Sequence, residues 1–174
     1  MILLISGTNR PNSITLQITK LYQGLLASRG HDSSILDLQD LPLDFASPTL
    51  YKSDLYSQAF LALRAQVAAA QKIVFFVPEY NCSFPGVLKA FIDGLEYPAA
   101  LRRKKGALVG LSTGSQGGNL ALSHLTDVLH YCGLHVLAQK PRLPFIHKHL
   151  AEGQFTNPLY LQLLEEQIEE LIAF

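Results

Sequence analysis

This sequence has few cysteines, no excess of charge and no long apolar run. Its two cysteines, Cys82 and Cys132, lie far apart and match no metal or redox spacing, which favours a reducing cytoplasm as the location. Lys plus Arg and Asp plus Glu number 14 each, so the formal net charge is zero and gives no electrostatic case for binding nucleic acid. The same balance argues against a carrier that docks through a strongly charged face.

Membrane and secretion signals are also lacking. No apolar run reaches the length of a membrane span, and the first residues have neither the basic region nor the cleavage site of a signal peptide. No repeat, linker or low-complexity segment interrupts the chain. With 174 residues, 48% of them hydrophobic and 16% charged, we expect one globular domain over residues 1–174, with neither a membrane nor a nucleic acid as partner.

Strand and helix patterns alternate along this chain. The expected strands are Met1–Ser6, Ser34–Leu38, Lys72–Val77, Ala107–Ser112 and Leu134–Leu137. The expected helices are Ser13–Arg29, Asp54–Gln71, Pro85–Leu95, Gly118–Cys132 and Pro158–Phe174. Near-continuous apolar strands between helices predict a parallel sheet covered on both faces. This rhythm favours the flavodoxin-like strand order 2-1-3-4-5 in a three-layer α/β sandwich.

Three polar loops follow the first, third and fourth expected strands, and they read GTNRPNS, PEYNCSFPG and STGSQGG. In this fold, ligands bind outside the carboxyl ends of the strands at the point where the strand order reverses, so we expect the loops to converge there. The first loop contains neither Gly-Lys-Ser/Thr nor G-x-G-x-x-G, which excludes a Walker A loop and a dinucleotide fingerprint.

The first loop opens a helix, whose free N–H groups attract anions. Thr8, Ser13 and Thr15 add hydroxyl groups, and Arg10 adds a cation that would oppose the helix dipole unless it served an anion. Ser13 is also a candidate N-cap, a role that is compatible with binding an anion beside it. A phosphate monoester satisfies all of these groups.

The second and third loops suit a planar ring. Glu79, Tyr80 and Asn81 follow Pro78 at the expected crevice, where Tyr80 or Phe84 can cover a ring face or simply pack in the core. The glycines of STGSQGG permit a close approach of backbone to a ligand. A phosphate at the first loop and a flat ring between the other two describe flavin mononucleotide (FMN).

The chain resembles the NADPH-dependent FMN reductase family, whose flavodoxin-like members include quinone, azo and chromate reductases. GTNRPNSIT is similar to the family's G-S/T-x-R-x-x-S phosphate loop, and VPEYNCSFPGVLKAFID is similar to its P-E-Y-N-x-S-x-P-G segment almost position for position. STGSQGGNLALSHLTDVL resembles the third loop and the helix after it. One departure is Leu120, where members often carry arginine.

The resemblance implies FMN as cofactor, NAD(P)H as co-substrate and a small-molecule electron acceptor. It implies that four residues hold the phosphate, namely Thr8, Arg10, Ser13 and Thr15. It implies that eight others frame the isoalloxazine, namely Pro78, Glu79, Tyr80, Asn81, Ser112, Thr113, Gly114 and Gly117. The chemistry then belongs to the flavin, so no catalytic side chain and no metal ligand are expected.

The apolar residues of the expected helix Gly118–Cys132 predict that the chain associates with copies of itself. Leu120 and Val128 extend its apolar surface beyond a single core stripe, which favours a homodimer or homotetramer. The loop Asp40–Ser53 carries Phe45 and Tyr51, which we expect to be exposed and so able to reach a partner's flavin.

Other residues receive structural interpretations. Cys82 has no resolving partner, His124 fits an ordinary helix histidine, and the basic run at 102–105 fits a solvated turn away from the crevice. The leading hypothesis is an FMN-dependent NAD(P)H oxidoreductase. The alternatives are a flavodoxin-type electron carrier and an interaction domain on a degenerate fold.

Overall fold

The computed structural model describes residues 1–43, 45 and 55–174. The strands of its main sheet are β1 (Ile2–Ser6), β2 (Ser33–Asp37), β3 (Lys72–Pro78), β4 (Lys105–Leu111), β5 (His135–Val136) and β6 (Arg142–Leu143). The α-helices are α1 (Ile14–Ser28), α2 (Gln58–Ala69), α3 (Gly86–Asp93), α4 (Asn119–Tyr131) and α5 (Pro158–Ala173). A small hairpin joins β7 (Leu150–Ala151) to β8 (Gln154–Phe155), and 3-10 turns cover Leu38–Asp40 and Ile146–Lys148.

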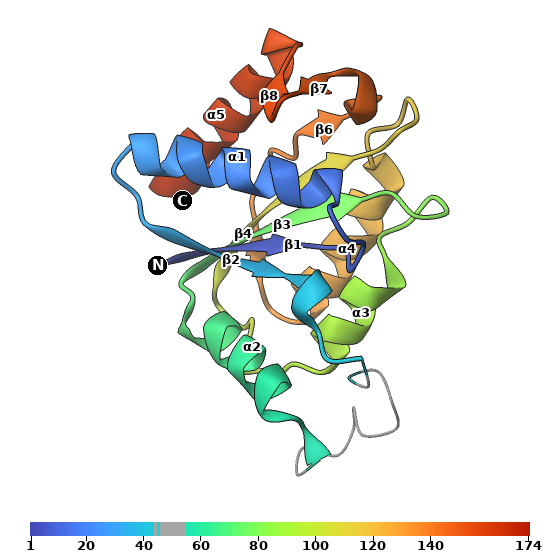
Figure 1. Ribbon diagram of the computed structural model, residues 1–174. Coiled ribbons are helices and arrows are strands. Elements are labelled where there is room, and N and C mark those ends of the chain that lie inside the picture. The colour runs from blue at the N-terminus through green and yellow to red at the C-terminus, as the bar shows by residue number, and fades with distance from the viewer. Residues whose placement is uncertain (44, 46–54) are drawn as a thin grey trace.

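The main sheet is parallel and has the order β2-β1-β3-β4-β5, with β6 also paired to β4. Helices α1 and α5 cover one face, and α2, α3 and α4 cover the other (Figure 1). The predicted three-layer α/β sandwich with order 2-1-3-4-5 is therefore confirmed. No helix in the described part of the chain is long and apolar enough to cross a membrane.

Two hydrophobic cores lie on opposite faces of the sheet, because successive strand residues point to opposite sides. Ile2 and Leu4 of β1 pack with α1 and α5, whereas Leu3 and Ile5 pack with α2, α3 and α4. All five residues of β1 are buried, which explains why its first four residues form an unbroken apolar run.

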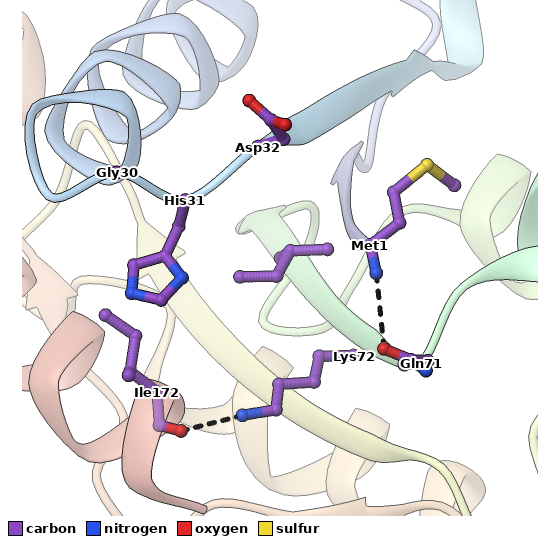
Figure 2. A pocket seen from close by; sticks show the side chains of 8 residues that line it. Met1, Gly30, His31, Asp32, Gln71, Lys72 and Ile172 are labelled. Atoms are coloured by element: carbon purple, nitrogen blue, oxygen red, sulfur yellow. Dashed lines mark hydrogen bonds between the residues drawn. The ribbon is translucent and has the colours of Figure 1, made fainter.

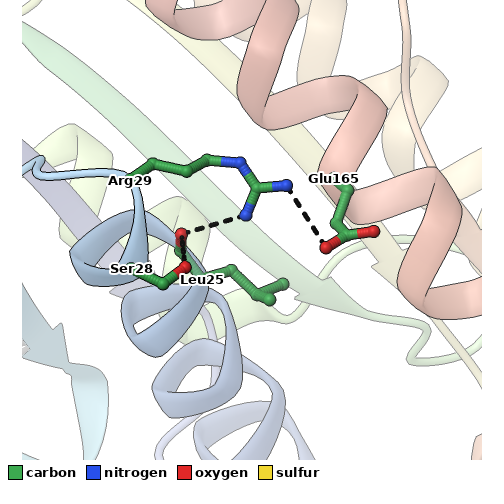
Figure 3. Close-up of polar contacts among 4 residues, drawn as sticks. All are labelled: Leu25, Ser28, Arg29 and Glu165. Atoms are coloured by element: carbon green, nitrogen blue, oxygen red, sulfur yellow. Dashed lines mark hydrogen bonds and ion pairs between the residues drawn. The ribbon is translucent and has the colours of Figure 1, made fainter.

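The carboxyl end of α1 is tied to α5 through Arg29 (Figure 3). Its guanidinium donates to the Leu25 carbonyl at 3.2 Å and pairs with Glu165 at 3.2 Å, and Ser28 Oγ donates to the same carbonyl at 2.9 Å. A cation at a helix C-terminus is favourable, but this pair is partly exposed, so its net contribution is at most about 1 kcal/mol.

The outer edge of β4 pairs with two short strands in place of one long one. Lys105 and Gly106 pair with β5, and Gly110 and Leu111 pair with β6. Between them, the Leu108 carbonyl accepts from the side-chain amide of Gln167 at 2.9 Å. Gln167 is fully buried in α5; it also donates to the Gln139 carbonyl and accepts from the Tyr22 hydroxyl.

Several predicted boundaries were wrong. The fourth strand begins at Lys105 and not at Ala107, and the fifth expected strand shrinks to two residues. The helix expected from Asp54 begins at Gln58. Strands β6, β7 and β8 were not predicted, because two-residue strands show no periodicity that a sequence pattern can detect.

The interpretation of the basic run as a solvated turn is corrected for its two lysines. Lys104 Nζ donates to the Val67 and Ala68 carbonyls at the end of α2, at 2.6 and 2.7 Å. Lys105 Nζ donates to the Phe174 carbonyl at the end of α5. Both ammonium groups therefore bind helix C-terminal carbonyls, where a cation complements the helix dipole.

Candidate functional site

A cavity of about 310 Å³ lies where β1, β3 and β4 end. Nine of the twelve predicted site residues line it: Thr8, Arg10, Ser13, Thr15, Pro78, Glu79, Tyr80, Ser112 and Thr113. It is also lined by five residues that were not predicted: Pro11, Asn12, Ile14, Leu111 and Ile146. The three polar loops therefore converge as expected.

Gly7 fixes the start of the first loop against β3. Its N–H donates to the Phe76 carbonyl at 2.9 Å, and a Cβ at this position would lie 2.6 Å from the same oxygen. Only glycine permits this approach without a shift of the backbone. The contact sets where the following residue, Thr8, enters the cavity.

The N-terminus of α1 opens into the cavity. Ser13 is its N-cap, and the Ser13 hydroxyl accepts from the Leu16 N–H at 3.1 Å. Ile14 and Thr15, which begin the first turn, line the cavity, and that turn contains no acidic residue. Helices commonly carry Asp or Glu in this turn, so its composition leaves the positive end of the dipole for an anion from outside.

Arg10 lies exposed on the lining of the same cavity. Among the described residues, no carboxylate lies within ion-pair distance of its guanidinium. A cation placed beside a helix N-terminus without an acidic partner raises the local positive potential. This end of the cavity therefore suits a ligand with negative charge.

The second loop is held by backbone contacts. Tyr80 and Ser83 exchange two hydrogen bonds, at 2.8 and 3.0 Å, around a tight turn at Asn81 and Cys82. Asn81 and Cys82 have φ of 49° and 59°, in the left-handed region. Asn81, a predicted site residue, is exposed at the tip of this turn and does not line the cavity.

Two side-chain hydrogen bonds hold this loop against α4. The Glu79 carboxylate accepts from the Gly118 N–H, the N-cap of α4, at 3.1 Å. His124 on α4 shares a 3.0 Å hydrogen bond between its Nδ1 and Ser83 Oγ. The expected ordinary helix histidine thus has a partner on the second loop. Phe84 is partly buried and packs against the core, and it does not line the cavity.

The third loop is shaped by the segment after β6. The Ser112 N–H donates to the Leu143 carbonyl at 3.2 Å, and the Ile146 N–H donates to the Ser112 carbonyl at 3.0 Å. Ser112 Oγ donates to the Gly114 carbonyl and accepts from the Gly117 N–H, both at 2.9 Å. These bonds hold the backbone of the loop in place beside the cavity.

Two predicted site glycines of this loop lie outside the cavity. Gly114 is exposed, with open space where a Cβ would stand. Gly117 has φ of 60°, and a Cβ there would lie within about 3 Å of Arg142, Leu143 and Pro144. The close approach that requires Gly117 is therefore to the chain's own backbone, and its N–H is already bound to Ser112.

A larger cavity of about 560 Å³ lies at the opposite end of the sheet (Figure 2). Two of its cationic groups are bound within the chain: the Met1 amino group donates to Gln71 at 3.3 Å, and Lys72 Nζ donates to the Leu171 and Ile172 carbonyls. It lies at the amino ends of β1 and β3, away from the three loops, so its size does not make it the site.

The segment proposed to reach a partner's flavin is partly described. Phe45 is half-buried and packs against Phe60, with ring centroids 6.0 Å apart, so the prediction of an exposed Phe45 was wrong. Tyr51 lies outside the described residues.

Comparison with known proteins identifies the family. Residues 1–147 match the family model described as NADPH-dependent FMN reductase. The chain belongs to the NADPH-dependent FMN reductase family. Members of this family are oxidoreductases, as the relatives' names also state.

Two relatives and one solved structure show the extent of the likeness. The chain is 32% identical to a 2-hydroxy-1,4-benzoquinone reductase of a Burkholderia species, over 84% of this chain and 78% of the relative. It is 29% identical to an NAD(P)H-dependent FMN reductase of Pseudomonas aeruginosa, over 98% and 92%. It superimposes on the flavoenzyme NAD(P)H:(acceptor) oxidoreductase of Paracoccus denitrificans with a TM-score of 0.83, at 23% identity, covering 99% and 94%.

Ile146 lines the cavity of this FMN reductase family member but was not predicted from the sequence. Its position depends on the pairing of β6 with β4, which the sequence pattern did not predict. Arg142 and Leu143 pair with Gly110 and Leu111, which brings Ile146 beside Ser112. The only local signal was the proline pair in PRLPF, which marks an irregular segment and not a site.

Proposed function

We propose that this chain is an FMN-dependent NAD(P)H oxidoreductase and that FMN occupies the 310 Å³ cavity. The observation that carries the proposal is the N-terminus of α1, which opens into the cavity without an acidic residue and with Arg10 beside it. A phosphate monoester is the anion that this combination of helix N–H groups, hydroxyls and guanidinium fits best.

The remaining lining residues fit the rest of FMN. Leu111 and Ile146 supply apolar surface, and Ser112 and Thr113 supply polar groups where β4 ends. A flat ring with a polar edge needs both kinds of surface, together with backbone groups that can reach its edge. Pro78, Glu79 and Tyr80 provide such a stretch of backbone, held in place by the Glu79 N–H bond to the Leu111 carbonyl at 2.9 Å.

In this proposal the role of the protein is to bind FMN and to orient its ring. Arg10, Thr8 and the first turn of α1 hold the phosphate, and the second and third loops hold the ring. When bound, FMN would supply the redox chemistry, with NAD(P)H as hydride donor to its N5 and a small molecule as the electron acceptor. The side chains therefore need no nucleophile, and their task is to hold the ring in place while leaving one face accessible.

The acceptor class that we propose is a quinone. A relative that is 32% identical over 84% of this chain is named for reduction of a benzoquinone. Azo compounds, metal oxyanions and free flavin are the other small acceptors that such a ring can reduce. We place the enzyme in the cytoplasm, in keeping with two cysteines that form no disulfide.

We further propose that the enzyme is a homodimer or homotetramer associated through α4. Leu122, Leu125 and Leu129 of α4 are buried, whereas Leu120 is 47% exposed and Tyr131 is 79% exposed. A cavity of about 670 Å³ lies between α3 and α4, where Val128 and Tyr131 of α4 line it. Exposed apolar residues along one helix are commonly covered by a second copy of the chain.

The proposed function is tested by removing Arg10. Loss of a charge-assisted bond to phosphate, worth about 1.5–3 kcal/mol, should weaken FMN binding by Arg10→Ala about ten- to a hundredfold. Riboflavin, which lacks the phosphate, should bind wild type and Arg10→Ala alike. Quenching of flavin fluorescence on titration measures both affinities.

The matched control is Lys20→Ala, which removes an exposed cation from α1 away from the cavity. It should leave both affinities unchanged. If Arg10→Ala weakens riboflavin as much as FMN, Arg10 does not bind the phosphate. If wild type binds neither flavin, the proposed function itself fails.

A further inference from the structure

Thr8 and Tyr80 are joined across the proposed site by a short hydrogen bond. Their hydroxyl oxygens lie 2.6 Å apart, and the residues come from the loops after β1 and β3. Thr8 is 1% exposed, and the Arg10 N–H donates to its hydroxyl at 3.3 Å. Both residues line the cavity together with Arg10.

The hydrogen-bonding capacity of Thr8 limits what its hydroxyl can do. A threonine hydroxyl has one proton and two lone pairs. The Arg10 N–H occupies one lone pair. A phenol is more acidic than an aliphatic alcohol, so between these two hydroxyls Tyr80 is the better donor and occupies the second lone pair. With both lone pairs filled, Thr8 can interact with a ligand only by donating its proton.

We infer that Tyr80 is a positioning residue that acts through Thr8 and commits the Thr8 proton to the phosphate of FMN. This inference rests on the proposed function and deepens it, because it assigns the phenol to selection of the phosphate and not only to the ring. Tyr80 O–H donates to Thr8 Oγ1, and Thr8 O–H donates to a phosphate oxygen. Without Tyr80, the Thr8 proton is free to rotate away.

The geometry of the second loop supports this role. The two backbone bonds between Tyr80 and Ser83, at 2.8 and 3.0 Å, fix the main chain from which the phenol extends. Glu79, the residue before Tyr80, accepts a hydrogen bond from the Gly118 N–H through its carboxylate. A hydroxyl supported by a fixed backbone loses little freedom when it orients its neighbour, so the arrangement is set before the ligand arrives.

A double-mutant cycle on flavin binding tests the inference. Tyr80→Phe, which keeps the ring and removes the hydroxyl, should weaken FMN about tenfold and leave riboflavin unchanged. Thr8→Val should weaken FMN about ten- to a hundredfold, again with riboflavin unchanged. In the Thr8→Val background, Tyr80→Phe should have no further effect on FMN, because its only route to the phosphate is gone.

The control is Tyr22→Phe, which removes a buried phenol that binds Gln167 away from the cavity, and which should change neither affinity. Equal weakening of FMN and riboflavin by Tyr80→Phe would overturn the inference, because Tyr80 would then act on the ring or on the loop as a whole. Persistence of its effect in the Thr8→Val background would also overturn it, because Tyr80 would then contact the phosphate itself. Riboflavin binding reports that each variant is folded, and a wild type that binds no flavin contradicts the proposed function instead.

Discussion

Replacing Glu79 should destabilise α4, although Glu79 lies in the loop after β3 and not in that helix. The N-cap of α4 is Gly118, which has no side chain to satisfy the first helical N–H groups. Glu79 Oε2 accepts from the Gly118 N–H at 3.1 Å and places a negative charge at the positive end of the helix. It therefore binds the N–H of the N-cap residue from another part of the chain, as the glutamate of a capping box does from within a helix, and it complements the helix dipole.

The magnitude follows from these two contributions. A hydrogen bond to a charged group contributes about 1.5–3 kcal/mol, and loss of the carboxylate would leave the partly buried Gly118 N–H without this acceptor. Glu79→Ala should therefore lower the free energy of unfolding by about 1.5–3 kcal/mol. Glu79→Gln keeps an acceptor oxygen and loses mainly the charge at the helix end, so it should cost only about 0.3–1 kcal/mol.

Urea unfolding followed by circular dichroism, in buffer without added flavin, measures both values. Glu169→Ala, which removes an exposed carboxylate from α5, is the control and should lie within about 0.5 kcal/mol of wild type. If Glu79→Ala is as stable as this control, the contact with Gly118 contributes nothing. If Glu79→Gln is as unstable as Glu79→Ala, the charge matters and the acceptor does not.

Two further predictions concern the core and the helical surface. Burial raises the pKa of Tyr22, so its phenol stays neutral in the folded protein while the unfolded chain ionises near pH 10; this contribution to stability is present below about pH 10 and is lost as the pH rises further. Tyr22→Phe should lower the free energy of unfolding by about 0.5–1.5 kcal/mol at neutral pH, because it loses the bond to Gln167. Above about pH 10, however, its melting temperature should fall less steeply with pH than that of wild type. If the melting temperatures of the two proteins fall in parallel above about pH 10, this prediction is wrong. Light scattering at micromolar concentration should give at least twice the 19.2 kDa of one chain, and Leu120→Asp should shift the mass toward one chain. A wild-type mass near 19.2 kDa would contradict the proposed association.

The fold was predictable because its strands carry their own signal. The β-branched and aromatic residues of KIVFFV predict a buried strand, and β3 spans them. Parallel strands with helical crossovers then place the loops after β1, β3 and β4 at one edge of the sheet. Nine of the predicted residues meet in one cavity for this reason, without any need to know a side-chain contact in advance.

The parts that were not predicted depend on partners far away in the chain. The role of Gly117 is set by residues 142–144, which reach it only because β6 pairs with β4. Lys104 and Lys105 look like any exposed basic run until the ends of α2 and α5 are placed beside them. Such contacts follow from three-dimensional register, which local patterning does not encode.

The side-chain amide of Gln167 has a consequence for how copies of this chain can associate. An unpaired stretch in the middle of an outer strand is a template on which a strand from another molecule can add. Here the Leu108 carbonyl is occupied by Gln167, and the stretches on either side of it are occupied by β5 and β6. An incoming strand would have to displace all three at once. This protection of the β4 edge directs association away from strand addition there and toward the helical faces of the molecule.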